Sequence, residues 1–268
     1  MAKFTIMGGS GFVGRNLAEY LTSKSHEVVI APRDVRELKG QELGHVVYTI
    51  GLTGDTRQRP HDAIEAHVSL LSWVLQNVKF ESFLYCSSTR IYEDLADDII
   101  ASEDTPITVT PNEQSLFSLS KLLGESLCQR MQNPQINIAR LSNVYGVGQS
   151  EKTFLGAVIA ELKKTGKVTI NDAKDSVKDY VAVEDVCEML EQIILHGQQQ
   201  VYNVASGKNT QTGQIGKWME QAGYEVTFSG QNPVRTFPQI DVTLLESEFA
   251  YEARDLSEDI QKLLEAQR

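Results

Sequence analysis

The sequence has few cysteines and no long apolar run. Cys86, Cys128 and Cys187 are scattered and form no CxxC pair, which argues against a disulfide framework or a zinc site and predicts free thiols in a reducing cytoplasm. No stretch approaches the roughly 20 apolar residues of a membrane span. The five-residue run before the first glycines is too short for a secretion signal. We therefore expect a cytoplasmic protein without a metal site or a membrane partner.

Basic residues are also in deficit, at 25 against 36 acidic ones, and the formal net charge is -11. A general nucleic-acid binder needs a basic surface to neutralise phosphates, so this charge argues against that class. It does not argue against a local basic pocket for a small anion, because net charge says little about one cleft. The 41% hydrophobic and 23% charged content is that of an ordinary globular protein.

Short apolar runs alternate with helical patterns along the chain. The runs predict strands at 3–7, 27–31, 45–50, 82–88, 136–141 and 201–205. The patterns between and after them predict helices at 15–24, 62–77, about 112–131 with Pro111 near its start, 183–195 and 255–267, with 93–110 as loop. Because the strands lack two-fold patterning, we predict an α/β fold with a doubly wound parallel sheet, covered on both faces. Residues 32–44 leave room for only one short helix between the second and third strands.

A glycine turn, GGSGFVG, joins the first strand to the first helix. The first glycine of its G-x-x-G-x-x-G spacing permits a sharp turn, the second lets backbone approach a pyrophosphate, and the third lets the helix pack closely. The helix N-terminus then faces the anion. We predict that the turn binds a dinucleotide through Gly8, Ser10, Gly11, Phe12, Val13 and Gly14. A glycine-rich loop without a ligand is the alternative.

The residues after the second strand bear on the kind of dinucleotide. An acid there would hold the ribose 2′-hydroxyl of NAD, whereas an arginine suits the 2′-phosphate of NADP. Arg33 and Arg36 follow this strand, and Asp34 is the one acid beside them. We predict NADP as cofactor, bound in part by Arg33, with NAD as the other candidate. Solvated surface charges explain these arginines equally well.

Five further motifs follow in order: YCSSTRIYED, ITVTPNEQSLFSLSKLLGES, ARLSNVYGVG, VKDYVAVEDV and VYNVASG. With the glycine turn they resemble the extended short-chain dehydrogenase/reductase family, which includes sugar-nucleotide epimerases, dehydratases and reductases. The resemblance implies a Rossmann-type dinucleotide-binding domain at 1–145, to which 177–205 returns. It implies a smaller substrate-binding part at 146–176 and 206–268, with a β-hairpin at 164–178. The short 32–44 gap then suggests that the family's third strand, at the sheet edge, is missing.

The resemblance places an unusual residue in the catalytic region. In the family a tyrosine carries the proton at the reacting carbon–oxygen centre, and a lysine four residues later lowers its pKa and holds the nicotinamide ribose. Lys121 matches that lysine, and Ser88 matches the hydroxyl that orients the substrate oxygen. Phe117 stands where the tyrosine is expected. Since a general acid–base group contributes about 10²–10⁴-fold, the usual mechanism is impaired unless another group substitutes.

Two further departures lie in the same region. His67 is near a family asparagine that supports a proton-relay water, although a structural histidine is an equally good interpretation. Glu93 stands where glycine is usual, and it adds a negative charge. Tyr92, Thr89 and Glu93 are candidates to replace the tyrosine, as is a water held by Ser88.

On the substrate side, Asn143 matches the family asparagine that contacts the sugar nucleotide, with a turn residue as the alternative. Lys178 occupies the position of an arginine that meets the diphosphate, and Arg235 resembles a later phosphate contact. Family members pair through the helices at about 62–77 and 112–131, so a homodimer with a four-helix bundle is implied. Burial against the sheet explains the apolar residues of these helices as well.

The resemblance implies an NAD(P)-dependent enzyme. It would transfer hydride between the nicotinamide and an NDP-sugar, with an atypical proton donor. The alternative is a sensor or partner subunit that keeps the cofactor pocket without the chemistry.

Overall fold

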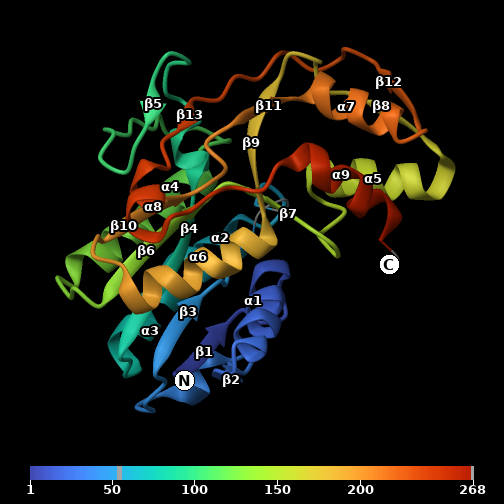
Figure 1. Ribbon diagram of the computed structural model, residues 1–268. Helices are drawn as coiled ribbons and strands as arrows, with labels where there is room; N and C mark the ends of the chain where they lie inside the picture. Colours follow the sequence, from blue (N-terminus) through green and yellow to red (C-terminus); the bar gives the residue numbers. More distant parts are fainter. Residues whose placement is uncertain (53–55, 267–268) are drawn as a thin grey trace.

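A six-stranded parallel sheet forms the centre of the molecule (Figure 1). The computed structural model describes residues 1–52 and 56–266. The strands are β1 (Lys3–Met7), β2 (Glu27–Ile30), β3 (His45–Tyr48), β4 (Ser82–Ser88), β6 (Ile136–Leu141) and β10 (Val201–Val204). Their order is β10-β6-β4-β3-β1-β2, and every neighbouring pair is parallel. This arrangement confirms the predicted doubly wound sheet.

The sheet ends at β2, as the short gap after it predicts. Between β2 and β3 the chain makes one short 3₁₀ helix, η1 (Val35–Leu38). The Asp34 side chain caps this helix by accepting a hydrogen bond from the Arg36 N–H at 3.1 Å. In the described part of the chain no strand lies beyond β2, so the family's usual edge strand is missing.

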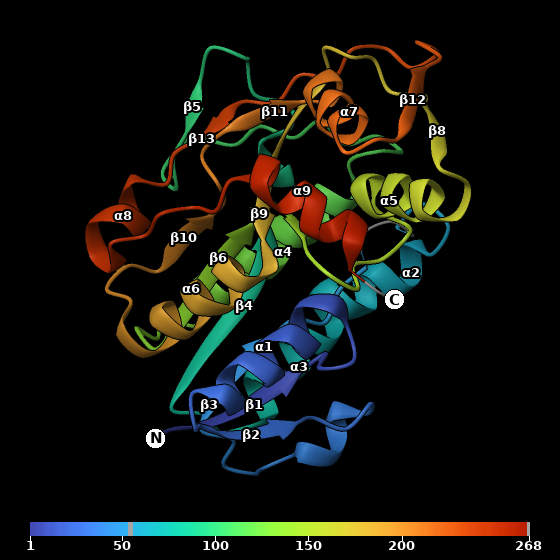
Figure 2. The same cartoon turned by 45° about the vertical axis from the view of Figure 1, so that its right-hand side comes forward.

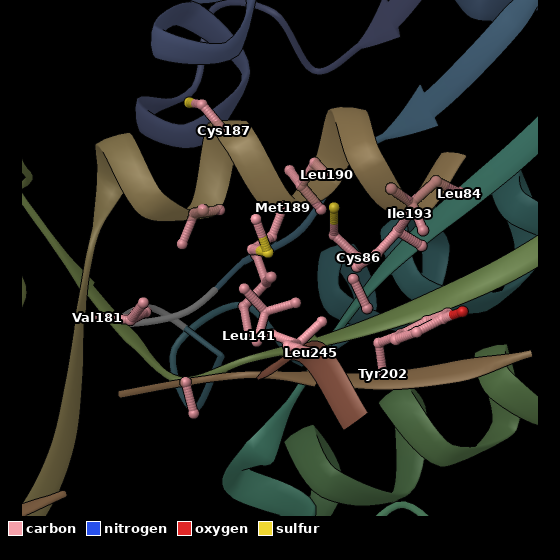
Figure 3. Close-up of a cluster of buried hydrophobic side chains, with 14 of the residues drawn as sticks. Leu84, Cys86, Leu141, Val181, Cys187, Met189, Leu190, Ile193, Tyr202 and Leu245 are labelled. Carbon is pink, nitrogen blue, oxygen red and sulfur yellow. The ribbon is translucent and has the colours of Figure 1, made fainter. Parts of the chain in front are cut away.

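Helices cover both faces of the sheet (Figures 1 and 2). The first face carries α1 (Phe12–Ser23) and α6 (Val183–His196), and α1 begins three residues earlier than predicted. The second face carries α4 (Leu116–Arg130) and a helical stretch made of α2 (Pro60–Ile64), the π-helical turn η2 (Glu65–Ser69) and α3 (Leu70–Asn77). A close-up of the first face shows Met189, Leu190 and Ile193 of α6 packed over Leu84, Cys86 and Leu141 (Figure 3).

The α4 helix begins at Leu116, about four residues later than predicted. Asn112 accounts for the difference, because its side-chain oxygen accepts hydrogen bonds from the N–H groups of Gln114 (2.7 Å) and Ser115 (3.1 Å). These bonds close a turn before the helix, and Pro111 lies outside it. Pro111 was predicted near the start of the helix, and it lies five residues before Leu116.

A second hydrophobic cluster lies past the carboxyl ends of the strands, where β9 (Val177–Ala182) leads away from the sheet (Figure 2). It includes residues of α5 (Phe154–Thr165), α7 (Thr212–Gln221) and α9 (Leu256–Glu265). Here β8 (Lys167–Ile170) pairs in parallel with β12 (Glu225–Phe228). β9 instead pairs with β7 (Asn143–Tyr145) and β11 (Asn209–Gln211). The predicted hairpin at 164–178 was therefore wrong, because β8 and β9 find partners elsewhere.

Part of the segment assigned from sequence to the smaller unit packs on the sheet. Helix α8 (Thr243–Phe249) contacts β10 and α6. Just before α8, β13 (Gln239–Ile240) pairs with β5 (Ile100–Ala101), a two-residue strand inside the predicted 93–110 loop. Among the described residues, no helix combines the length and apolarity needed to cross a bilayer.

Candidate active site

The glycine turn has the geometry of an anion-binding loop. Gly8 has φ +93°, and its carbonyl accepts the Gly11 N–H at 2.9 Å. A Cβ at Gly14 would lie 2.4 Å from the Gly8 carbonyl oxygen, so only glycine permits this contact. Helix α1 has no side-chain cap and no acid in its first turn, which leaves its N–H groups available to an anion. The residues predicted for this loop lie together there: Gly8, Ser10, Gly11, Phe12, Val13 and Gly14.

A short loop after β3 connects this turn to the catalytic candidates. At one end a Cβ on Gly8 would lie 2.7 Å from Thr49 Oγ1. At the other a Cβ on Gly51 would lie 3.5 Å from Lys121 Nζ. Since Thr49 and Gly51 are two residues apart, the glycine turn and Lys121 both lie at the carboxyl ends of the central strands.

Lys121 reaches the carboxyl end of β4 from α4. Its Nζ donates a hydrogen bond of 2.8 Å to the carbonyl oxygen of Cys86, two residues before Ser88. Burial lowers the pKa of Lys121 to about 8, against a smaller opposing effect of Cys86 and Glu125. The fold therefore places Lys121 at the end of β4, the strand that ends in Ser88.

His67 is held by the protein on both ring nitrogens. Nε2 accepts the Leu52 N–H at 3.2 Å, and Nδ1 lies 2.8 Å from Ser120 Oγ. Ser120 Oγ in turn donates to the Phe117 carbonyl at 2.8 Å, so Nδ1 is the donor in the pair and the ring is neutral. Burial, reinforced by Lys121, lowers the pKa of His67 to about 3. These contacts favour the structural interpretation of His67.

The Phe117 ring lies between an imidazole and a guanidinium. The His67 ring meets it edge-on at 5.6 Å between centroids, and the Arg90 guanidinium carbon lies 5.2 Å from its centroid. Arg90 Nε donates to Glu93 Oε2 at 3.0 Å, and Glu93 Oε1 accepts from Ser118 Oγ at 3.2 Å. Sequence reasoning missed Arg90, although a cation two residues after the predicted serine was visible in SSTRIY.

Among the candidates to replace the tyrosine, Tyr92 faces away from this site. Its hydroxyl accepts a hydrogen bond from Arg140 Nη1 at 2.6 Å and lies 2.9 Å from Asn203 Oδ1. Burial raises its pKa to about 12, although Arg140 opposes the shift. Thr89 is buried beside Ser88, and Glu93 is tied to Arg90.

Three of the predicted substrate residues lie on or beside β9. Lys178, on β9, has its Nζ 3.6 Å from Asp172 Oδ2 and 4.8 Å from the centre of the Phe154 ring. The Arg235 backbone pairs with Val177 (3.0 Å) and with Ser176 Oγ (3.0 Å), which places Arg235 next to Lys178 in space. Asn143, exposed on β7, donates from Nδ2 to the Asp179 carbonyl at 2.7 Å.

The two arginines after β2 differ in their surroundings. Arg36 Nη2 lies 2.7 Å from Glu65 Oε1, and its Nη1 lies 3.7 Å from Asp34. Within residues 1–52 and 56–266, Arg33 makes neither an ion pair nor a side-chain hydrogen bond. Of the two, Arg33 is the one available to a ligand.

The fold and the uncapped glycine loop define a Rossmann-type protein. A model of the NAD dependent epimerase/dehydratase family matches residues 4–59 and 35–205. The chain belongs to this family, a family of NAD-dependent enzymes that act on nucleotide sugars.

Individual relatives agree with this assignment. A GDP-6-deoxy-D-talose 4-dehydrogenase of Aggregatibacter actinomycetemcomitans is 25% identical over 210 residues, 72% of this chain and 70% of the relative. Among solved structures, the NAD dependent NDP-hexosamine 5,6-dehydratase TunA superposes with a TM-score of 0.83 and is 20% identical in sequence. The superposition covers 99% of this chain and 97% of that chain. MoeE5 in complex with UDP-glucose and NAD superposes with a TM-score of 0.82 and is 19% identical, and the superposition covers 98% of this chain and 97% of that chain. At these identities the structural likeness shows the fold alone.

Proposed function

We propose that this protein binds a nicotinamide dinucleotide and transfers hydride between it and the sugar of a nucleotide sugar. The proposal rests on one observation: the uncapped N-terminus of α1, Ser88 and Lys121 all lie at the carboxyl ends of the central strands. When bound, the cofactor supplies or accepts the hydride. The protein residues hold the two reactants and manage the proton.

The role of each residue follows from its chemistry. The first N–H groups of α1 bind the pyrophosphate, because they point at the anion and the helix dipole favours negative charge. Lys121 holds the nicotinamide ribose, and Ser88 orients the reacting oxygen. Phe117 cannot move a proton, so a water held by Ser88 or by the neighbouring Thr89 takes that role. Tyr92 is set aside because its hydroxyl is already hydrogen-bonded elsewhere.

NADP is the cofactor that the surroundings of β2 favour. Arg36 and Asp34 are used within the protein, whereas Arg33 is exposed. An arginine in this position accommodates the 2′-phosphate of NADP. NAD remains the alternative, and the binding experiment below includes both.

The substrate is held at its charged end by Lys178 and Arg235. Their positive charges suit a diphosphate, and a chain with a net charge of -11 needs such local cations to attract one. Asn143 contacts the nucleotide sugar from β7, with its side-chain oxygen. For the assembly we propose a homodimer through α3 and α4, where Leu123 is 50% exposed.

Phe117 also supports a second candidate function, a dinucleotide sensor without catalysis. Without a phenol the site lacks the family's usual proton carrier. Lys121 would still hold the cofactor in such a protein. Binding and turnover must therefore be measured separately.

The test combines calorimetry with a turnover assay. NADPH, NADH and their oxidised forms are titrated first. Cofactor absorbance is then followed with UDP-, GDP-, CDP- and dTDP-sugars. We expect binding, slow turnover, and a loss of about 10²-fold or more in kcat/KM for Ser88→Ala and Lys121→Met. Lys24→Met, at an exposed lysine after α1, is the matched control. Binding without turnover would favour the sensor, and no affinity for any of the dinucleotides would refute both.

A further inference from the structure

Arg90 has a guanidinium whose outer edge is open. Its Nε is used by Glu93, but neither Nη1 nor Nη2 makes a hydrogen bond to any residue of 1–52 or 56–266. These two groups form a planar fork that matches a carboxylate in geometry. Because Glu93 is itself held by Ser118, the guanidinium is fixed in place before a ligand arrives.

The position of Arg90 assigns the fork to the sugar end of the substrate. It follows Ser88 by two residues in one turn, and its N–H donates to Ser88 Oγ at 3.2 Å. It also covers the Phe117 ring, one helical turn before Lys121. Ser88 and Lys121 mark the reacting carbon–oxygen centre of the proposed function, so the Arg90 fork lies beside that centre.

Arg90 is the third cation at the substrate end of the site. Lys178 and Arg235 already provide two cations for a diphosphate. Burial lowers the pKa of Lys178 and Asp172 opposes this shift, while repulsion from Arg235 and Arg90 adds to it, so the three positive charges lie near one another. Asp172 beside Lys178 and Glu93 beside Arg90 already offset part of this charge, so what is free for a ligand is the pair of Nη groups of Arg90. The Phe117 side chain has no hydrogen-bond acceptor, so both Nη groups of Arg90 stay available to a ligand.

We propose that the sugar of the substrate carries a carboxylate, as in a hexuronic acid, and that Arg90 binds this carboxylate with both Nη groups. The proposal rests on the proposed function and adds the class of sugar to it. Arg90 is then a specificity-determining residue. It does not replace the missing tyrosine, because a guanidinium stays protonated and cannot pass a proton.

The experiment compares sugar nucleotides that differ only at C6. Calorimetry in the presence of the cofactor gives Kd values for UDP-glucuronic acid against UDP-glucose, and for GDP-mannuronic acid against GDP-mannose, with UDP and GDP alone as references. The variants are Arg90→Met, which keeps the apolar stem, and Arg90→Lys, which keeps the charge without the fork. Arg130→Met, at an exposed arginine in the last turn of α4, is the matched control.

We expect the wild type to bind at least one acidic sugar nucleotide 10-fold or more tightly than its neutral counterpart. Arg90→Met should weaken that acidic ligand about 30-fold or more, and Arg90→Lys should recover only part of the loss. The neutral sugar nucleotides, UDP and GDP should change less than 3-fold in Arg90→Met, and Arg130→Met should change nothing.

Two results would overturn the proposal while leaving the proposed function intact. One is wild-type binding and turnover of neutral sugar nucleotides with no preference for acidic ones. The other is an equal loss for acidic ligands, neutral ligands and free UDP in Arg90→Met, which would assign Arg90 to the diphosphate. If the wild type binds cofactor but no sugar nucleotide of either kind, the proposed function fails together with this inference.

Discussion

Phe117→Tyr restores the hydroxyl that the family's proton transfer uses, and it adds a single oxygen. The Phe117 side chain is 4% exposed, so the new hydroxyl has to find its partners inside the site. His67 cannot serve, because both of its ring nitrogens are already bonded. Arg90 lies over the ring and Lys121 is one turn further along α4, and two nearby cations lower the pKa of a phenol.

The expected gain follows from two opposing effects. A placed general acid–base group contributes about 10²–10⁴-fold to the rate, or roughly 3–5 kcal/mol of barrier. An imperfectly bonded buried hydroxyl costs about 1–3 kcal/mol. The middle of this difference, about 2 kcal/mol, predicts that Phe117→Tyr raises kcat by roughly 10- to 100-fold.

Initial rates of cofactor oxidation or reduction measure this effect, and a pH profile should gain a limb from the new phenol. Phe80→Tyr makes the same change before β4, away from the site, and should leave the rate unaltered. If the wild type turns over and Phe117→Tyr equals it, the missing hydroxyl does not limit the reaction. If both bind cofactor and neither consumes it, the protein is a sensor.

Three further predictions concern the cofactor and the stability of the fold. Arg33→Glu should raise the Kd for NADPH by about 10-fold or more and leave that for NADH nearly unchanged, because charge-assisted bonds to the 2′-phosphate are lost; equal effects on both cofactors would refute this role. Glu125→Gln should lower the free energy of unfolding by about 3–5 kcal/mol, because Arg140 stays charged in the core without its carboxylate partner. Urea unfolding checks this. The double variant Glu125→Leu/Arg140→Met, which removes both charges, should lose much less of the free energy of unfolding. His67 is neutral in the fold with its pKa lowered to about 3, so from pH 6.5 downward the unfolded chain takes up a proton that the folded one does not. Stability should therefore fall as pH falls, and unfolding at pH 7 and pH 5 should show His67→Gln losing about 2 kcal/mol less than the wild type over this interval.

Local pattern was enough to predict the central sheet and the glycine turn before α1. The central strands read as continuous apolar runs because both of their faces are covered. The turn from Gly8 to Gly14 could be predicted because its glycines allow a positive φ and a close backbone approach within one strand–turn–helix unit. The short spacing between β2 and β3 likewise predicted the missing edge strand, since chain length limits what a crossover can hold.

Errors arose where a segment's partner is distant in sequence. The predicted hairpin at 164–178 was wrong because β8 pairs with β12, nearly sixty residues later, and no local pattern records that choice. The β5 strand was missed for the same reason, since its partner is β13.

The sequence by itself determined the class of fold and the glycine turn, and it predicted a site around Ser88, Phe117 and Lys121. Only the tertiary structure decided that Tyr92 is bonded away from the site and that Arg90 covers the Phe117 ring. The physical reason is that a backbone motif is satisfied within a few neighbouring residues. The role of a side chain depends instead on which groups from other elements accept its hydrogen bonds and face its charge.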